Sequence, residues 1–266
     1  MTDETQNAAG KVLVAVDFTA STLRLRLANL DGTVVKTAEH AMPELATEEE
    51  WSWEIGGRIA TLFAAEGNRL SAVAIGVAAP GPVDPITGHL LRPNDGQAAW
   101  EGLAIVEVLR RHIDVPIVAV NRVAAGLHAE RWAGAAQGSE NAIYLALRGV
   151  PAAAIVAGGR LLHGEAREAG ALPAVPQFEP GVRLAGRDLE AAAGLLADAV
   201  ALLDPELVIV DAADEHAEPL LPLLQRVIDE VAPGPRVVRS ELGENGPIIG
   251  ATGFASTVAF EGEREA

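Results

Sequence analysis

Residues 11–37 read KVLVAVDFTASTLRLRLANLDGTVVKT, and this stretch carries the strongest signal for the fold. Its first part, 11–17, is an apolar run of strand length that ends in an acidic residue. Residues 22–30 then alternate, with leucines on one face and arginines on the other, as in a half-buried strand. Asp31-Gly32 predicts a tight turn, after which 33–37 returns as a third strand. The protein is therefore predicted to open with an antiparallel meander.

Helices and strands alternate after this meander, and the whole order then repeats. Thr47 and Glu50 form a capping-box pattern at the start of an amphipathic helix. The remaining predictions for the first half are strands at 71–77 and 115–120 and helices at 103–112 and 123–132. A second meander is predicted at 142–147, 152–156 and 160–162, followed by a helix around Leu189–Leu203, a strand at 207–210, a helix at 219–231, a strand at 237–238 and a helix at 248–258. The repeat is one of topology, because the two halves share no sequence pattern.

Composition narrows the classes of function. The 266 residues are 49% hydrophobic but only 4% aromatic, which is typical of aliphatic sheets packed against helices. The absence of cysteine excludes disulfides, thiolate zinc sites and cysteine nucleophiles. A formal charge of −17 argues against direct binding of nucleic acid. No stretch resembles a signal peptide or a membrane span, so we expect a cytoplasmic protein without a membrane partner.

Several ordered motifs make the chain resemble the ROK family of bacterial sugar kinases and sugar-responsive repressors. They are Val14-Ala-Val-Asp17, Leu30-Asp-Gly32, Ile75-Gly-Val-Ala-Ala-Pro-Gly-Pro-Val-Asp84, Thr87-Gly88, Pro93-Asn94, Trp100-Glu-Gly102, Val115-Pro116, Val120-Asn121, Gly159-Arg-Leu-Leu-His-Gly164, Asp204-Pro-Glu-Leu-Val-Ile-Val210 and Ile249-Gly-Ala251. The resemblance implies an α/β, two-lobed actin-like ATPase (ribonuclease H-like) fold, with a mixed sheet and flanking helices in each lobe. The lobes are expected at 11–120 and 121–258, between tails at 1–10 and 259–266, with the last helix able to pack back on the N-terminal lobe.

The resemblance also assigns a catalytic base, and this chain lacks it. In ROK kinases the base is an Asp that follows an Asn just after a strand; here Asn121 is followed by Arg122. A guanidinium stays protonated and cannot accept a proton, so we name no catalytic residue. Arg122 then marks a dead site or grips an anionic ligand, or it is only a surface arginine at a helix start.

The phosphate-binding loops depart from the family pattern as well. Where the family has Asp followed by Gly-Gly-Thr, this chain has Asp17-Phe-Thr-Ala-Ser21, which leaves Asp17, Thr19 and Ser21 as phosphate-side or metal-side candidates. An Asp17 that merely ends its strand is the alternative. The second loop, 148–154, keeps a single glycine and contains Pro151, and Asp211-Ala212 replaces the nucleotide-side Gly-Gly.

The sugar and zinc motifs of the family are reduced too. Gly170-Ala-Leu-Pro-Ala174 stands where the family carries Gly-Glu-Ile-Gly-His, so neither the sugar-binding Glu nor the zinc-binding His is present. We therefore expect no metal site and no structural zinc. The remaining sugar-side candidates are Asn94, Asp95, Glu101 and Asn121, with Arg122 as a further ligand-binding candidate. Asparagines in loops are also common turn formers, which is the alternative for both of them.

Three functions remain open from the sequence. The first is an inactive kinase homologue that senses a sugar or sugar phosphate or binds a protein partner, expected as a homodimer and without a cofactor. The second is a divergent sugar kinase that uses Mg-ATP, with Asp17 or Asp95 as the substitute base. The third is a structural paralogue that assembles with an active ROK protein or a transcriptional regulator. Because only ten residues precede Lys11, we expect no helix-turn-helix in this chain.

Overall fold

The computed structural model describes residues 10–67, 69–94, 96–165, 169–178, 181, 186–231 and 234–265, without the side chains of 261–265. The expected N-terminal tail, apart from Gly10, and the candidate Asp95 lie outside these residues. The chain divides into two compact units, one formed by Met1–Ala125 with Pro247–Ala266 and the other by Gly126–Gly246. The last helix is thus part of the first unit, and the boundary at Ala125 falls inside a helix.

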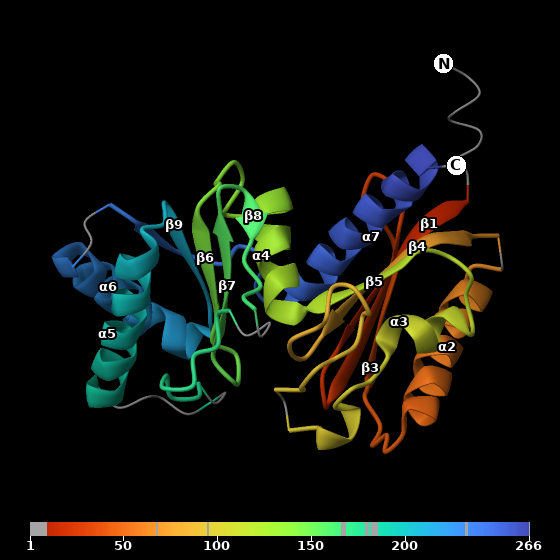
Figure 1. The fold of residues 1–266 in the computed structure, drawn as a ribbon, viewed down its shortest axis with the longest axis horizontal. Coiled ribbons are helices and arrows are strands. Elements are labelled where there is room, and N and C mark those ends of the chain that lie inside the picture. Colours follow the sequence, from red (N-terminus) through yellow and green to blue (C-terminus); the bar gives the residue numbers. More distant parts are fainter. Residues whose placement is uncertain are drawn as a thin grey trace. The chain divides into compact units, whose positions relative to one another are not determined.

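The first unit contains the predicted meander, extended by two parallel strands (Figure 1). Its strands are β1 (Lys11–Phe18), β2 (Thr22–Ala28), β3 (Val34–Ala41), β4 (Ser71–Ala79) and β5 (Ile117–Asn121). They are ordered β3-β2-β1-β4-β5, with antiparallel pairing in the meander and parallel pairing of β1 with β4 and of β4 with β5. The carboxyl ends of β1, β4 and β5 therefore meet at one edge of the sheet.

Helices cover both faces of this sheet, because the buried strand β1 is apolar on each of its sides (Figure 1). Val12, Val14 and Val16 pack toward α2 (Glu48–Ala65) and α3 (Ile105–Arg110). Leu13 and Ala15 face α7 (Gly246–Glu265) instead. The predicted capping box of Thr47 and Glu50 starts α2. The alternation of β1 residues between two cores explains why its sequence is a continuous apolar run.

The second unit repeats this topology with different residues. Its strands are β6 (Ala142–Ala146), β7 (Ala152–Ala157), β8 (Arg160–Leu161), β9 (Leu207–Asp211) and β10 (Arg236–Arg239), in the order β10-β9-β6-β7-β8. Gly158 and Gly159 both have positive φ in the predicted turn between β7 and β8. The topological repeat predicted from the sequence is confirmed.

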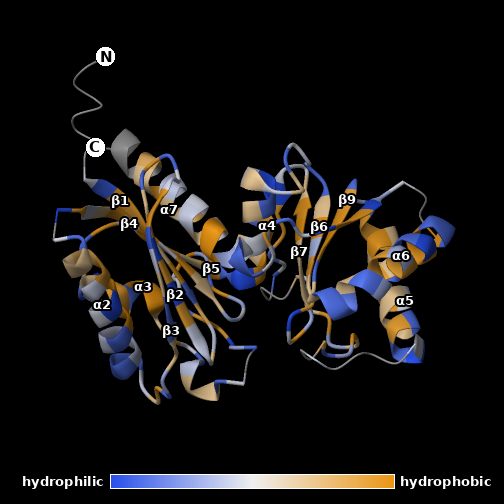
Figure 2. Cartoon of the chain, turned by 180° about the vertical axis from the view of Figure 1, so that it is seen from behind, coloured by the Kyte–Doolittle hydropathy of each residue, from blue (hydrophilic) through white to orange (hydrophobic). Residues whose placement is uncertain are grey.

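The helices α5 (Gly186–Leu203) and α6 (Asp214–Val231) pack on the second sheet, and Figure 2 shows apolar and polar residues on both of them. Asp204, with a positive φ of 44°, follows the end of α5 as predicted. The predicted start of α6 at Pro219 is wrong, because the helix begins at Asp214. Proline is typical of a first turn, but the burial of His216 and Ala217 stabilises an earlier turn in helical form.

Other helix ends also differ from the predictions. The helix α4 (Arg122–Ala133) begins at Arg122, one position before the predicted start, and α7 begins at Gly246. The helix α7 also continues to Glu265, through a segment that the sequence analysis placed in a tail. The glycine–alanine pair in α7 serves packing, since a Cβ on Gly250 would lie 1.9 Å from the carbonyl oxygen of Ala125.

Candidate functional site

Two family-matched candidates of the first unit, Asp17 and Asn121, lie at the carboxyl edge of its sheet. Asp17 pairs with Ala78 across β1 and β4, and Ala79 pairs with Asn121 across β4 and β5. The three strand ends therefore bring Asp17 and Asn121 to the same edge, although they are remote in sequence. The order of the strands, which the sequence pattern alone does not give, creates this arrangement.

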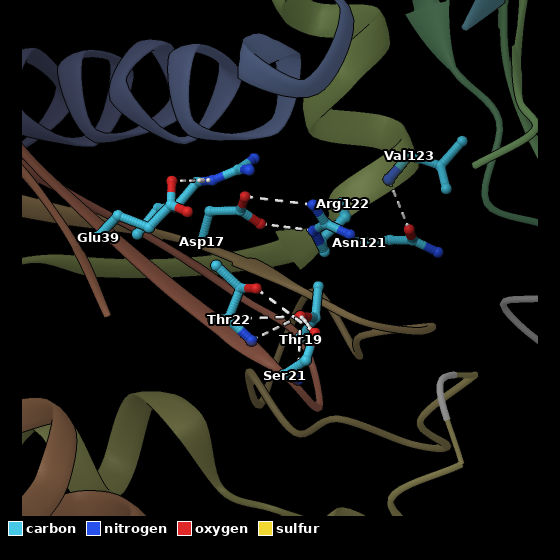
Figure 3. Close-up of polar contacts among 9 residues, drawn as sticks. Asp17, Thr19, Ser21, Thr22, Glu39, Asn121, Arg122 and Val123 are labelled. Atoms are coloured by element: carbon cyan, nitrogen blue, oxygen red, sulfur yellow. Dashed lines mark hydrogen bonds and ion pairs between the residues drawn. The ribbon is translucent and has the colours of Figure 1, made fainter. Parts of the chain in front are cut away.

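Asp17 and Arg122 bind each other at this edge (Figure 3). The Nε of Arg122 donates to Oδ1 of Asp17 over 2.5 Å, and a terminal nitrogen donates to Oδ2 over 3.2 Å. The Asp17 side chain is 2% exposed, whereas that of Arg122 is 28% exposed. Both carboxylate oxygens therefore accept from the guanidinium, which compensates the burial of the negative charge.

Asn121 caps the helix that carries Arg122 and so helps to place Arg122 beside Asp17. Its Oδ1 accepts a hydrogen bond of 2.8 Å from the backbone N–H of Val123, which is an N-cap interaction at the start of α4 (Figure 3). The strand β5 thus passes directly into the helix, and Arg122 occupies the first helical position. The turn-forming role that the sequence left open for Asn121 is present in the structure.

The turn after β1 satisfies its own polar groups. The Oγ1 of Thr19 accepts from the backbone N–H of Ser21 over 3.3 Å and from that of Thr22 over 3.0 Å. The backbone N–H of Thr19 donates to the carbonyl of Thr22 over 2.8 Å. A loop that cradles phosphate directs backbone N–H groups toward the ligand. In this turn, the amides of Thr19, Ser21 and Thr22 bond within the loop (Figure 3).

The other sugar-side candidates differ in their surroundings. The backbone N–H of Asn94 donates to the carbonyl of Pro80, directly after β4, which places half-buried Asn94 at the same sheet edge. Gly81 permits this close approach, since a Cβ there would lie 2.0 Å from the carbonyl oxygen of Arg92. Glu101 is exposed after a short 3₁₀ helix, Ala98–Trp100, and Asp95 lies outside the described residues.

A second Asp–Arg pair lies at the carboxyl edge of the other sheet, and it was not predicted from the sequence. The Nε of Arg148 donates to Oδ1 of Asp211 over 2.6 Å, and the hydroxyl of Tyr144 donates to Oδ2 over 2.9 Å. Arg148 also donates to the carbonyl of Ala212 and to Glu244. The sequence contained an indication of this pair. Arg122 and Arg148 each closely follow a buried strand, and the chain has few cationic residues.

Burial and charge change the acidity of this second cluster. Burial, together with the negative charge of Asp211, raises the pKa of Tyr144 well above its ordinary value. Burial acts to lower the pKa of Arg148, but the hydrogen bond and the charge of Asp211 outweigh it, and the pKa is raised. The phenol and the guanidinium therefore stay protonated and donate to Asp211 at neutral pH.

The described residues contain no group of three or more histidines, aspartates or glutamates placed to hold a metal ion. In the same part of the chain, no helix has the length and apolar character needed to cross a membrane.

Two mixed sheets, each a meander extended by parallel strands and flanked by helices, define the actin-like ATPase fold of sugar kinases. The chain belongs to the ROK family, whose sequence model matches residues 13–182. A ROK family transcriptional regulator described as a homologue of the E. coli MLC protein has a TM-score of 0.80 at 18% identity, over 96% of this chain and 80% of the regulator.

Kinases of the same family are also similar. The Streptomyces griseus ROK glucokinase, solved with glucose and AMPPNP, has a TM-score of 0.72 at 18% identity, over 92% of this chain and 99% of the kinase. A glucokinase of Halalkalibacterium halodurans is 27% identical over 168 residues, which are 56% of this chain and 49% of that enzyme. The aligned part of the chain thus spans about half the length of this curated relative.

Proposed function

We propose that this protein is a catalytically inactive homologue of ROK sugar kinases that works as a ligand-sensing or regulatory module. The ion pair between Arg122 and Asp17 is the observation that supports this proposal most directly. Arg122 stands where the family carries its catalytic base, and Asp17 stands where the family carries its phosphate-side carboxylate.

Phosphoryl transfer needs a base, a metal-linked phosphate site and fixed substrate hydroxyls. Losing a positioned base costs about 10²–10⁴ in rate, and Arg122 cannot replace it because it remains protonated. Both oxygens of Asp17 already accept from Arg122, and amides of the adjoining turn bond internally. These residues do not fit Mg-ATP, so the proposal includes no cofactor. It also includes no structural zinc, because Gly170-Ala-Leu-Pro-Ala174 lacks the zinc-binding His of the family.

A sugar or sugar phosphate is the proposed ligand at the carboxyl edge of the first sheet. Asn94 and Asn121 would hydrogen-bond its hydroxyls, and the Nδ2 of Asn121 is suited to donate because its Oδ1 caps α4. We propose further that the protein acts in the cytoplasm as a homodimer and transmits ligand binding to a protein partner. Assembly with an active ROK protein is one form that such a partnership would take.

A divergent sugar kinase is the second candidate, favoured by the 27% identity to a glucokinase. Asp95 would then have to act as the base, since Arg122 engages Asp17. This candidate predicts turnover of glucose or N-acetylglucosamine with Mg-ATP.

The deciding experiment is a thermal-shift series with Mg-ATP, glucose, N-acetylglucosamine and glucose 6-phosphate, followed by a coupled kinase assay. A ligand at 100-fold over its Kd adds about 2.7 kcal/mol to the free energy of unfolding, which shifts the Tm by several degrees. We expect a shift with a sugar or sugar phosphate, no shift with Mg-ATP and no turnover. Asn94→Ala should abolish the shift, whereas Asn29→Ala, at an exposed position after β2, should retain it. A shift with Mg-ATP together with turnover would overturn the proposal in favour of the kinase.

A further inference from the structure

An apolar pocket of about 450 Å³ lies on the surface of the first unit, away from the residues of the candidate site. Its walls come from α2, from the segment leading into β4 and from the residues after α3. Trp53 and Phe63 of α2, Leu70, His112 and Ile113 are among the lining residues. A volume of this size is typical of a site for a small molecule.

Two glycines in the middle of α2 form the floor of this pocket, although glycine disfavours a helix interior. A Cβ on Gly56 would lie 3.0 Å from the ring of His112, so packing accounts for that glycine. A Cβ on Gly57 would meet no atom within 4 Å. Neither packing nor backbone conformation therefore requires glycine at position 57, and its missing side chain keeps the pocket open.

His112 provides a hydrogen-bond acceptor at the rim of the pocket. The hydroxyl of Ser52 donates to the carbonyl of Val108 over 3.1 Å. We assign Nε2 as the donor in the 2.8 Å contact between Ser52 Oγ and His112 Nε2, because the one hydroxyl hydrogen of Ser52 is directed to Val108. In the neutral imidazole, Nδ1 is left with a lone pair that is not bonded to any of the described residues.

The residues that line the pocket indicate which kind of ligand it can bind. Trp53 is 66% exposed and meets His112 edge to face, with 5.1 Å between the ring centroids. Aromatic rings favour offset and edge-to-face contacts with another ring. No lining residue within the described part of the chain is an acid or a permanent cation, which offers no partner to a charged ligand.

We propose that this pocket binds a small, neutral aromatic molecule that carries one N–H or O–H donor, such as an indole or a phenol. The ring packs between Trp53, Phe63 and Ile113 above Gly57, and the donor bonds to Nδ1 of His112. The proposal does not depend on the sugar site, since it shares no residue with Asn94, Asn121 or Arg122.

The test is calorimetric titration of the full chain with indole and with benzofuran, which has the same ring shape without the N–H donor. We expect saturable one-site binding of indole, and binding of benzofuran weaker by about 3- to 10-fold, as for the loss of one hydrogen bond. Equal affinity for the two compounds would overturn the role of His112. Absence of indole binding to the wild-type chain would overturn the proposal.

A pocket-filling variant locates the site. Gly57→Leu adds a side chain whose Cβ meets no atom within 4 Å, so the variant should fold at least as stably as the wild type and lose indole binding. Gly194→Leu is the matched control, because position 194 lies in α5 and a Cβ there also meets no atom within 4 Å. It should bind indole like the wild type. Retained binding in Gly57→Leu would contradict the location. If the wild type binds no indole and the Gly57→Leu dimer dissociates, the pocket is a contact between two chains and not a ligand site.

Discussion

Arg122 and Asp17 lie 105 positions apart in the chain and form a two-point ion pair in which only the arginine reaches solvent. A similar pair joins Arg148 to Asp211 in the second unit. In each case an aspartate near the carboxyl end of one strand is bound by an arginine that follows another strand of the same sheet. That strand is β5, separated from β1 by β4, in the first unit, and β6, next to β9, in the second. The carboxyl edge of an α/β sheet is where ligands usually bind, and here arginines of the chain itself engage the aspartates.

Removal of the arginine from the first pair should be strongly destabilising. Arg122→Ala leaves the carboxylate of Asp17 buried and unpaired, so we expect a loss of about 3–5 kcal/mol in the free energy of unfolding. Urea denaturation measures this loss. Arg111→Ala, which breaks exposed ion pairs with Glu107 and Glu48, should cost less than about 1 kcal/mol.

A double-mutant cycle separates the pair from the individual side chains. Adding Asp17→Asn to Arg122→Ala removes the unpaired charge and should recover part of the lost stability. Strictly additive effects of the two substitutions would show that the side chains do not interact.

Tyr144 gives a spectroscopic test of the second cluster, because it is the only tyrosine in the sequence. Burial and the charge of Asp211 raise its pKa, so the phenolate absorbance near 295 nm should appear well above pH 10 in the folded protein. In guanidinium chloride the same residue should titrate near its ordinary pKa of about 10.

The direction of the pH dependence follows from this raised pKa. Below about pH 10, Tyr144 is protonated in both the folded and the unfolded chain. Above that pH the unfolded chain loses the proton first, so stability should fall as pH rises. Tyr144→Phe should have no phenolate signal, and a wild-type signal at pH 10 in the native state would contradict the burial of the phenol.

Glu130 is fully buried in α4, and its side-chain carboxylate accepts three hydrogen bonds. The donors are the backbone N–H groups of Ala135 and Leu242 and the hydroxyl of Ser240. Glu130→Gln would turn an amide NH₂ toward groups that donate, so we expect a loss of about 2–4 kcal/mol in the free energy of unfolding. Glu190→Gln, at an exposed position of α5, should change it by less than about 0.5 kcal/mol. Equal effects of the two substitutions in urea denaturation would refute the network.

Two helical glycines should respond oppositely to alanine. Gly250→Ala drives a Cβ to within 1.9 Å of the carbonyl oxygen of Ala125, so we expect a loss of about 1–3 kcal/mol despite the better helix propensity. Gly194→Ala meets no atom within 4 Å and should stabilise by about 0.5–1 kcal/mol. Thermal unfolding of both variants measures the contrast. Stabilisation by Gly250→Ala would show that α7 can shift at this position.

Most of the fold followed from local patterns. The alternation in 22–30, the capping box at Thr47 and the glycine pair at 158–159 act over a few residues, so their structures were predictable. The ends of the helices were less predictable. The early start of α6 depends on burial of His216 and Ala217 against the core, which outweighs the local preference of two prolines.

The sequence alone establishes that an arginine follows Asn121, and this arginine cannot abstract a proton wherever its side chain points. It also determined the repeated meander, because a period of two residues fixes which side chains share a face. The direction of the Arg122 side chain and the binding of Asp211 by Arg148 are seen only in the folded chain. Those contacts join residues brought together by strand order, and no local pattern records a partner that lies tens of positions away.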